Sequence, residues 1–421
     1  MLGNYYWKLR DRAGKFYYQS CLPLVLKHRA LSIGKKDKIE VVFFAINLAM
    51  WNYQRIYDFL SKDEHFNCHI VFTVPITFSV DQQDMDLKQM REYFTYKGIE
   101  YIDHKVNDEQ GFDVKGLINP DILFYPQPYE CIYPKNHEFL VFKDKLLCYI
   151  PYGIYITDDD SWQYDLKFHN LAWKIYCPFQ QYRDKARKVA RNRGKNWVVS
   201  GNDHLDRYLS PETTDMWKIK DRSVKRLIWA PHFTITKVTW IEPRSSFLWM
   251  SQLMLDIAEK NKDRLQIAFK PHPRLKSELY LHPDWGKEKT DQYYQCWESM
   301  QNTQLETGDF IDLFKASDAM IHDSGSFTIE YLFVNKPVAF TTTDFEALKS
   351  GHNEIARACL DQYYVVHDEN ELMAYIKDVV IAGQDTMKEK RTAFFQTSLK
   401  PNVKGNTSEF IVNDIKKSLG L

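Results

Sequence analysis

Short apolar runs alternate along the chain with longer segments in which apolar residues recur at helical spacing. In the first part of the chain the short runs span residues 38–50, 69–76, 121–130, 146–156 and 196–201. The helical patterns between them span residues 51–60, 82–97 and 179–193. Continuous runs rich in β-branched and aromatic residues are typical of strands in a parallel sheet that helices cover on both faces. The pattern therefore predicts a doubly wound α/β domain.

The same alternation starts again near Arg226. Strand patterns span residues 226–233, 265–275, 319–326, 337–342 and 363–368. Helical patterns span residues 247–260, 310–316 and 327–334, and further helices are expected after the last strand. Two Rossmann-like halves are therefore expected. Because doubly wound sheets bind ligands at the carboxyl ends of their strands, the default site is a central cleft that the two sheets face.

A chain of 421 residues exceeds the size of one typical core, which agrees with two halves. A polar stretch that contains Pro211 is the expected joint between them. We divide the chain into a basic N-terminal segment (1–38), an N-terminal Rossmann-like domain (39–201), an interdomain joint (202–225), a C-terminal Rossmann-like domain (226–400) and a C-terminal helical tail (401–421).

The N-terminal segment is strongly basic, with nine Lys and Arg residues against two Asp in residues 1–38. Its apolar residues recur at helical spacing and leave basic side chains on the other side. The apolar positions are Leu2, Tyr5, Tyr6, Leu9, Ala13, Phe16 and Tyr17. A basic amphipathic helix is typical of a segment that lies on an anionic membrane surface. A helix docked on the protein body with a solvated basic face fits the same pattern.

Composition narrows the function classes. Lys plus Arg and Asp plus Glu balance at 56 each, so bulk charge does not attract nucleic acid. The seven cysteines are scattered and form no CxxC pair, which favours reduced thiols in a cytoplasmic compartment over a disulfide scaffold or a zinc site. No apolar run is long enough for a membrane span, and no signal peptide is expected.

Polar residues gather where three strands of the second half end. His232 follows the first strand, and Lys270, His272 and Arg274 follow the second. The third is followed by His322, Asp323, Ser324 and Ser326. Alone, a His beside Pro is typical of a turn, and a Ser before a helix is typical of an N-cap. Together at one sheet edge, they favour a polar binding site.

The chemistry of this edge suits a phosphate. Ser-Gly-Ser before a helix offers backbone N–H groups, hydroxyls and the positive end of the helix dipole. Gly325 lets the backbone approach a ligand closely. His232, Lys270 and His272 could balance the charge of a diphosphate. Glu330 could accept hydrogen bonds from ribose hydroxyls, or be an ordinary solvated helix residue.

Other motifs give weaker signals. The GxGxxG, P-loop and GxSxG patterns are absent. Asp158, Asp159 and Asp160 contain a DxD that could hold a divalent metal, although an acidic triplet is more often a solvated turn or cap. We therefore expect no metal site and no cofactor.

Four ordered motifs in the second half resemble the CDP-glycerol glycerophosphotransferase family, the bacterial teichoic-acid-type polymerases and primases with a GT-B fold. The motifs are SGNDHLDRY (200–208), IWAPHF (228–233), FKPHPRL (269–275) and DLFKASDAMIHDSGSFTIEYLFVNKPVAF (312–340). The resemblance covers roughly residues 196–345 and is looser over 39–195. It implies an N-terminal acceptor domain and a C-terminal nucleotide-donor domain.

The resemblance also implies roles for single residues. His272, Asp323, Ser324 and Ser326 would bind the phosphates and ribose of CDP, with His272 stabilising the leaving CMP. His322, Gly325, Lys270 and Arg274 belong to the same implied site. The chain departs from the family at two loops. The N-terminal Trp-His-Gly, whose His is the family's candidate base, is replaced by Pro151-Tyr152-Gly153, and His232 stands where Thr is common. The candidate bases that remain are His169, Asp158–Asp160 and Tyr152.

We therefore expect a transferase that moves glycerol phosphate or ribitol phosphate from a CDP-activated donor to a hydroxyl of a cell-surface glycan or polyol phosphate, which could be lipid-linked. CMP is released, and no cofactor is required. One alternative is a GT-B glycosyltransferase that uses a nucleotide sugar for capsule or surface polysaccharide synthesis. Another is a non-catalytic nucleotide-binding subunit. A cytoplasmic location is expected, peripheral on the inner face of the membrane if residues 1–38 bind it.

Overall fold

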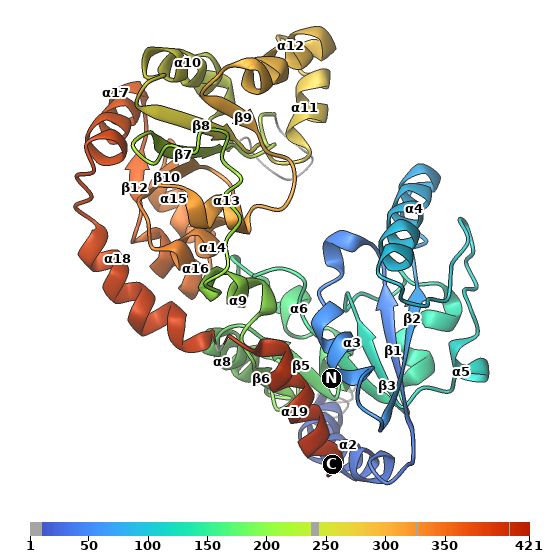
Figure 1. Ribbon diagram of the computed structural model, residues 1–421. Helices are drawn as coiled ribbons and strands as arrows, with labels where there is room; N and C mark the ends of the chain where they lie inside the picture. The colour runs from blue at the N-terminus through green and yellow to red at the C-terminus, as the bar shows by residue number, and fades with distance from the viewer. Residues whose placement is uncertain (1–10, 237–243, 326, 404) are drawn as a thin grey trace, which may run out of the picture. The chain divides into compact units, whose positions relative to one another are not determined.

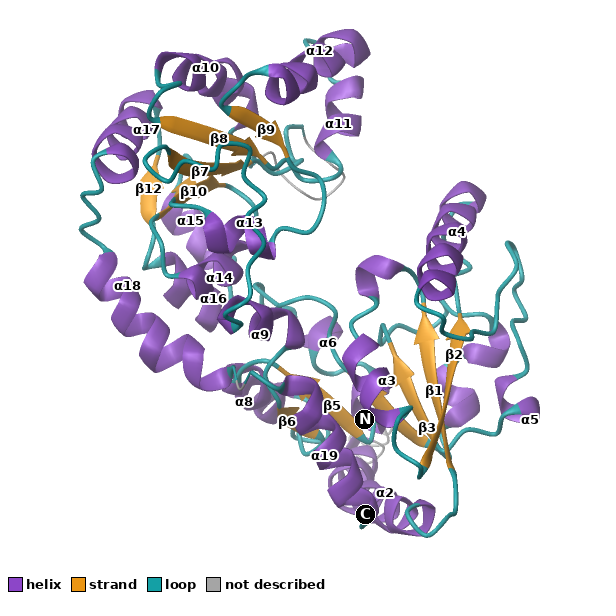
Figure 2. Ribbon diagram, viewed as in Figure 1, coloured by secondary structure: helices purple, strands orange, loops and turns teal. Residues whose placement is uncertain are grey.

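The computed structural model describes residues 11–236, 244–325, 327–403 and 405–421, and this part forms two compact units (Figure 1). The first unit comprises residues up to 154, 159–206 and 402–421. The second comprises residues 155–158 and 207–401. Each unit contains one sheet with helices around it (Figure 2), so the expectation of two Rossmann-like α/β halves is confirmed.

The first unit contains a six-stranded sheet of order β2-β1-β3-β4-β5-β6 in which every neighbouring pair is parallel. Its strands are β1 (Ile39–Ala45), β2 (Phe66–Phe72), β3 (Ile122–Tyr125), β4 (Leu146–Tyr149), β5 (Lys174–Cys177) and β6 (Trp197–Val199). The strands β3, β4 and β5 are buried at every position, as in a sheet with helices on both faces.

The helices of the first unit lie between these strands, before the first and after the last. They are α2 (Leu22–Ile33), α3 (Gln54–Leu60), α4 (Val80–Tyr96), α5 (Val114–Leu117), α6 (Asp160–Gln163), α7 (Lys167–Leu171), α8 (Gln180–Val189) and α19 (Thr407–Leu419), while α9 (Asp203–Leu209) spans the division between the units. Residues 11–21 are also helical and lead into α2. The expected N-terminal helix is therefore described only from Asp11, and its residues 1–10 lie outside the described residues.

The second unit contains a parallel six-stranded sheet of order β12-β11-β10-β7-β8-β9. Its strands are β7 (Lys225–Ala230), β8 (Leu265–Phe269), β9 (Thr303–Leu305), β10 (Ala319–His322), β11 (Val338–Thr341) and β12 (Tyr364–Val366). Its helices are α10 (Phe247–Lys260), α11 (Leu275–Leu281), α12 (Gly286–Ser299), α13 (Ile311–Ala316), α14 (Phe327–Glu330), α15 (Phe345–Ser350), α16 (Glu354–Leu360), α17 (Glu369–Ala374) and α18 (Lys388–Phe394). The core of this unit is aromatic, and the rings of Trp229, Phe247 and Phe269 stack against one another.

The C-terminal helix α19 is an integral part of the first unit. Ile411, Ile415 and Leu419 belong to the core cluster that contains β1 and α2. The carboxylate of Asp414 accepts hydrogen bonds from Lys174 and Tyr176 on β5. The last residues of the chain therefore complete the first unit's core.

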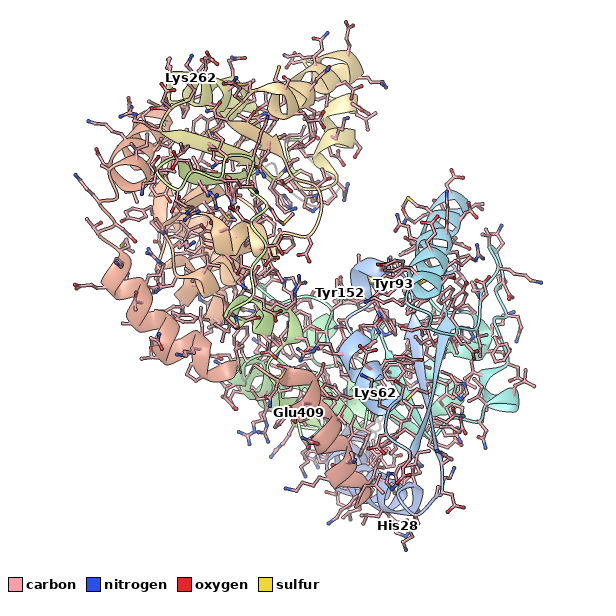
Figure 3. All side chains as sticks on the ribbon, viewed as in Figure 1. His28, Lys62, Tyr93, Tyr152, Lys262 and Glu409 are labelled. Carbon is pink, nitrogen blue, oxygen red and sulfur yellow. The ribbon has the colours of Figure 1, made fainter. Side chains whose placement is uncertain are left out.

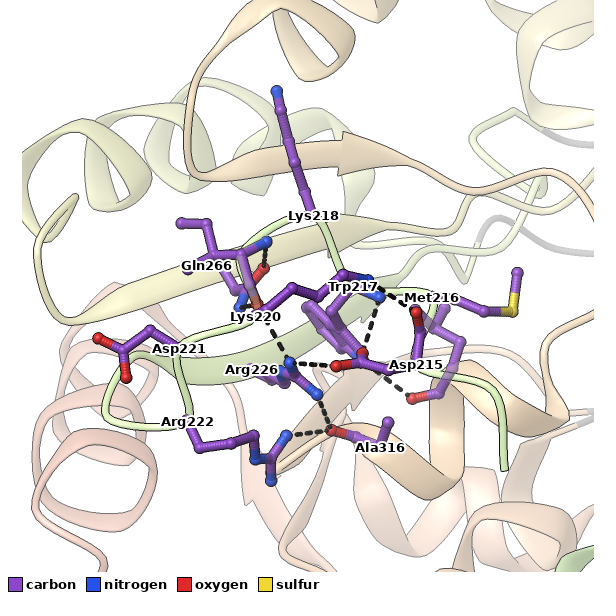
Figure 4. A network of polar contacts seen from close by, with 12 residues as sticks. Asp215, Met216, Trp217, Lys218, Lys220, Asp221, Arg222, Arg226, Gln266 and Ala316 are labelled. Atoms are coloured by element: carbon purple, nitrogen blue, oxygen red, sulfur yellow. Dashed lines mark hydrogen bonds and ion pairs between the residues drawn. The ribbon is translucent and has the colours of Figure 1, made fainter. Parts of the chain in front are cut away.

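The connector before β7 is fixed by a buried ion pair (Figure 4). Arg226 is almost fully buried, and its guanidinium donates to Asp215 at 2.8 Å and to the carbonyl of Ile219 at 3.1 Å. Trp217 donates its indole N–H to the carbonyl of Leu313. These contacts hold the connector against the amino ends of the second sheet's strands, away from the carboxyl ends where ligands bind.

Among the helices that the structure describes, none has both the length and the apolar character required to cross a lipid bilayer.

Candidate functional site

Three neighbouring strands of the second sheet bring the predicted site residues together. Because β10 pairs with β7 and β7 with β8, their carboxyl ends lie side by side. Two backbone bonds extend this pairing into the loops: Lys270 N–H donates to Trp229 O at 2.8 Å, and His272 N–H donates to Pro231 O at 3.0 Å. We call loops 231–234, 270–274 and 323–325 the cradle.

Asp323 connects the cradle to the start of α10 by hydrogen bonds. Its side chain is buried, and one oxygen accepts the backbone N–H of His232 at 2.5 Å. The other oxygen accepts the backbone N–H of Ser246 at 2.6 Å and its hydroxyl at 2.8 Å. Burial raises the pKa of Asp323, while these hydrogen bonds act against that shift. The carboxylate that the sequence suggests as a ligand therefore positions the loop of His232 and the start of α10.

His232 and His272 face one another across the cradle, with ring centroids 5.0 Å apart. Burial lowers the pKa of each ring to about 4. The positive charges of Arg274 and Lys270 also lower the pKa of His272. A proton on the neighbouring His272, and the charges of Arg244 and Arg274, act in the same direction on His232. Both imidazoles are therefore neutral at pH 7, and each can donate one hydrogen bond without carrying a charge.

The hydrogen bonds of His272 define its tautomer. Its Nδ1 accepts the backbone N–H of Arg274 at 3.1 Å, so in the neutral ring the proton lies on Nε2. Within the described residues Nε2 has no hydrogen-bond partner. His272 therefore has an N–H group available for a ligand oxygen.

Two cations flank the histidines. Lys270 is largely buried, and its amine donates to Gly308 O at 3.1 Å and lies 5.2 Å from the Phe310 ring. Burial lowers the pKa of this amine. Arg274 is exposed, stacks over the ring of Phe233 at 4.2 Å and pairs with Glu278 at 2.8 Å. The exposed guanidinium of Arg274 is the more accessible of the two charges.

The Asp-Ser-Gly turn follows β10. Ser324 is buried, and Ser326 lies outside the described residues. A Cβ on Gly325 would lie 2.4 Å from Cδ1 of Ile156, so a larger residue here would displace the Ile156 side chain. The helix that follows, α14, has only four residues before it tightens into a 3₁₀ turn at Tyr331–Val334. The expected helix dipole is correspondingly small, and local N–H groups and side chains dominate the cradle.

His322 and Glu330 are placed differently from the cradle loops. His322 is buried, its Nε2 lies 3.2 Å from the hydroxyl of Tyr363, and burial lowers its pKa to about 3. It is therefore a core residue of β10. Glu330 is half-buried at the end of α14 and accepts a hydrogen bond from Tyr208 at 3.1 Å. Its carboxylate is thus anchored within the protein by Tyr208.

Two of the candidate bases lie in the first unit. His169 is fully buried, and its Nδ1 accepts the backbone N–H of Leu166 at 3.2 Å. Burial lowers the pKa of His169 to about 3, and this enclosed position argues against contact with a substrate. Tyr152 is 49% exposed on the loop after β4 (Figure 3).

The three consecutive aspartates, Asp158–Asp160, make different contacts. Asp159 caps α6 by accepting the backbone N–H of Trp162 at 3.2 Å, and Asp160 pairs with Lys185 at 2.8 Å. Asp158 is exposed and belongs to the second unit, two residues after the Ile156 that packs at Gly325. In the described part of the chain, no group of three His, Cys, Asp or Glu side chains is arranged to hold a metal ion.

Sequence reasoning missed the segment before α10. Ser246 meets Asp323 and also lies 2.6 Å from the hydroxyl of Thr341, while Arg244 is exposed beside His232. The available signal was the Pro-Arg-Ser-Ser sequence directly before an apolar helix, which is typical of an N-terminal cap. Neutral N–H donors, hydroxyls and exposed guanidiniums at one sheet edge form an environment that suits a phosphate ester.

The comparisons with known proteins agree with this chemistry. Residues 196–417, more than half of the chain, match the model of the CDP-Glycerol:Poly(glycerophosphate) glycerophosphotransferase family. The match includes the whole cradle. No curated protein sequence matches the chain.

Solved structures resemble the fold at low sequence identity. The wall teichoic acid polymerase TagF, in a variant soaked with CDPG, covers 100% of this chain and 98% of its own, with 12% identity and a TM-score of 0.57. A putative UDP-N-acetylglucosamine 2-epimerase from Listeria monocytogenes covers 91% and 96%, with 13% identity and a TM-score of 0.57. The Neisseria meningitidis UDP-GlcNAc 2-epimerase bound to UDP-GlcNAc covers 90% and 100%, with 14% identity and a TM-score of 0.56. The chain therefore has the GT-B fold and belongs to the CDP-glycerol glycerophosphotransferase family.

Proposed function

We propose that this protein transfers a polyol phosphate from a CDP-activated donor to a hydroxyl group of a cell-surface glycan or polyol-phosphate acceptor. The observation that carries the proposal is the cradle, which the family match covers in full. Its neutral histidines and exposed Arg274 suit the diphosphate of such a donor, and TagF supports a donor of the CDP-glycerol type.

In this reaction an oxygen of the acceptor attacks the β-phosphorus of the donor. The bond between that phosphorus and the bridging oxygen breaks, and CMP leaves with the electron pair. The N–H of His272 Nε2 donates to an oxygen of the diphosphate and stabilises charge that increases on the leaving phosphate. The guanidinium of Arg274 stabilises the same negative charge. We propose that these side chains stabilise the charge and that no resident cofactor is needed.

The acceptor proton needs a base, and we propose Asp158. Of the candidate bases, Asp158 is exposed and lies in the same unit as the cradle, on the segment that packs at Gly325. Asp158→Asn should lower kcat by at least a hundredfold and change KM little, since general base catalysis contributes about 10²–10⁴-fold. Asp144→Asn, which alters an exposed pair with Lys115 and is not a candidate base, is the control. Equal activity of Asp158→Asn and the control would exclude this role.

Donor screening tests the overall proposal. CMP release should be measured with CDP-glycerol, CDP-ribitol and a set of nucleotide sugars, each with a polyol-phosphate acceptor. Turnover of a CDP-polyol supports the proposal. Turnover of nucleotide sugars alone would replace it with a glycosyltransferase, and CDP binding without any turnover would indicate a non-catalytic subunit.

A matched pair of histidine variants tests the cradle. His272→Ala should lower kcat/KM by about 10²–10³-fold, as removal of a preorganised donor does in other enzymes. The control is His282→Ala, because the Nδ1 of His282 accepts a backbone N–H two residues later in the same way as His272 does. His282 follows α11 outside the cradle. Equal losses in both variants would show that the effect is structural.

We also propose that the N-terminal helix binds an anionic membrane surface. Phe16, Tyr17, Leu24 and Leu31 are 42–69% exposed on the helical stretch 11–33. Lys15, Lys27 and His28 are exposed on the same stretch, where Figure 3 labels His28. Exposed apolar side chains among cations are the pattern of an interfacial helix. One face of this stretch docks on the protein body, since the core cluster of the first unit includes Leu22, Leu26, Ala30 and Ile33. We propose that the exposed face binds the membrane.

Vesicle sedimentation tests this proposal. The protein should pellet with vesicles that contain phosphatidylglycerol and remain in the supernatant with phosphatidylcholine alone. Leu24→Glu should reduce pelleting strongly, because it places a charge in the apolar contact. Leu281→Glu is the control, since Leu281 is also exposed, at the end of α11 in the other unit. Equal pelleting of the Leu24 variant and the native protein would contradict the proposal.

A further inference from the structure

A second pocket opens directly beside the cradle. It lies between the start of α10, the loop after β11, the first turn of α15 and the end of β12, and its volume is about 330 Å³. Asp323 and Ser246 line this pocket and also form the hydrogen bonds that hold the cradle. The pocket therefore adjoins the cradle and shares these two residues with its supporting hydrogen bonds.

The described lining of the pocket is rich in hydroxyl and carboxyl groups. Four hydroxyls come from Ser245, Ser246, Thr342 and Thr343. Asp344 adds a carboxylate to that of Asp323. Alternating donors and acceptors of this kind match a polyhydroxylated ligand, because each ligand hydroxyl both donates and accepts.

Two of these groups retain hydrogen-bonding capacity. One oxygen of Asp344 caps α15 by accepting the N–H of Ala347 at 2.9 Å, and the other makes no hydrogen bond within the described residues. The exposed hydroxyl of Thr343 also makes none within them. At the rim, the ring of Trp249 is 41% exposed, and Arg244 supplies a cation close to the cradle. An exposed indole can pack on the C–H face of a carbon chain while the hydroxyls bind the polar groups.

We propose that this pocket, which we call the polyol pocket, binds the polyol moiety of the CDP-activated donor. The inference rests on the function proposed above and adds the residues that select the polyol. Asp344 and Thr343 bind its hydroxyls, Trp249 contacts its carbon chain, and Arg244 lies near the phosphate that is transferred.

The pocket volume predicts which polyol is preferred. The pocket, of about 330 Å³, has room for a polyol longer than glycerol. A polyol of about five carbons should therefore be bound more tightly than glycerol, since it can reach more of the hydroxyls and carboxylates that line the pocket.

Binding of three ligands to the full-length protein separates the pocket from the nucleotide site. Affinities for CDP, CDP-glycerol and CDP-ribitol are measured by calorimetry. Asp344→Asn should weaken CDP-ribitol about tenfold and leave CDP unchanged, because it removes a charged acceptor and keeps the helix cap. Thr343→Val should weaken CDP-ribitol about threefold. Asp113→Asn is the control, since Asp113 caps α5 of the other unit by accepting Gly116 N–H at 2.8 Å.

The outcomes distinguish failure of this inference from failure of the proposed function. Native protein that neither binds nor turns over any CDP-polyol overturns the proposed function and this inference together. Turnover of a CDP-polyol by the native protein, with unchanged CDP-ribitol affinity in both pocket variants, overturns only the inference. Loss of CDP affinity equal to that of CDP-ribitol also overturns it, because the variants would then act on the nucleotide site. A selective loss for the CDP-polyols supports it.

Discussion

The carboxylate of Asp323 holds two loops of the second unit at once. Its oxygens accept N–H groups from His232 and Ser246 and the hydroxyl of Ser246, all in a buried environment. An amide in its place keeps the shape but presents an NH₂ group to one of these donors. Such a mismatch leaves a buried N–H without an acceptor, which typically costs about 1–3 kcal/mol.

We therefore predict that Asp323→Asn lowers the free energy of unfolding by about 2 kcal/mol and weakens CDP binding. Urea unfolding measures the first effect and calorimetry the second. The control is Asp221→Asn, because Asp221 accepts the N–H of Ser223 at 2.9 Å at an exposed turn, where the change should stay within about 0.5 kcal/mol. Normal stability of the Asp323 variant would show that the loops do not depend on this carboxylate.

The sequence predicts which residues lie at the carboxyl edge of the second sheet but not which hydrogen bonds each side chain makes there. The strand ends place His232, His272 and Asp323 together because parallel strands share a carboxyl edge. Sequence alone does not show that Asp323 bonds to Ser246, since the two are far apart in the chain. His322 lies at the same strand end, but it is the last residue of β10, a strand that is buried at every position, so its ring packs in the core.

At the scale of elements, the strand β5 shows how tertiary contacts hide a strand from sequence analysis. It begins with Lys174, which is typical of a surface position. In the structure Lys174 is only 8% exposed because Asp414 of α19 pairs with it. The sequence pattern also does not predict the strand β9 or the helices α11 and α12. The helix α12 buries the aromatic residues Tyr293, Tyr294 and Trp297, although most of its other residues are charged or polar.

The pair of Lys174 and Asp414 fixes α19 on the first sheet, and Asp414→Asn tests it. The variant leaves a largely buried ammonium without its carboxylate, so stability should fall by about 2 kcal/mol. The double variant Lys174→Met, Asp414→Leu should recover most of the loss, because apolar groups of similar size replace the pair. Denaturant unfolding of both variants measures this.

Asp144→Asn provides the matched control for that experiment. Asp144 pairs with Lys115 at 3.3 Å, and both side chains are about half exposed. An exposed pair of this kind contributes about 0–1 kcal/mol. If both aspartate variants lost the same small amount, α19 would be held by its apolar contacts alone.

At the scale of the whole molecule, the two units are not continuous pieces of sequence. Residues 155–158 belong to the second unit, where Asn353 donates its backbone and side-chain N–H groups to Ile156 O and Tyr155 O, each at 2.7 Å. Residues 402–421 belong to the first. Strand and helix patterns are local, so they predict two sheets but not these exchanges of chain. The exchange brings Ile156 into contact with the cradle loop at Gly325.

Both units also share a dependence on pH through buried neutral histidines. Burial lowers the pKa of His137 to about 4 and those of His169 and His322 to about 3. An unfolded histidine titrates near 6.5, so between about pH 6.5 and 4 the unfolded chain binds protons that the folded protein does not. The stability from these groups is therefore complete above pH 6.5 and is lost as the pH falls.

We predict that the free energy of unfolding decreases below pH 6.5, with a slope of up to about 1.4 kcal/mol per pH unit for each buried histidine. Urea unfolding at a series of pH values measures the slope. His322→Gln should reduce it by the share of one histidine, because Gln in the unfolded chain cannot bind the proton that an unfolded His binds. His28→Gln, at an exposed position on α2, should leave the slope unchanged. An unaltered slope in the His322 variant would mean that carboxylates rather than buried histidines cause the acid sensitivity, and that burial on β10 does not keep this ring neutral.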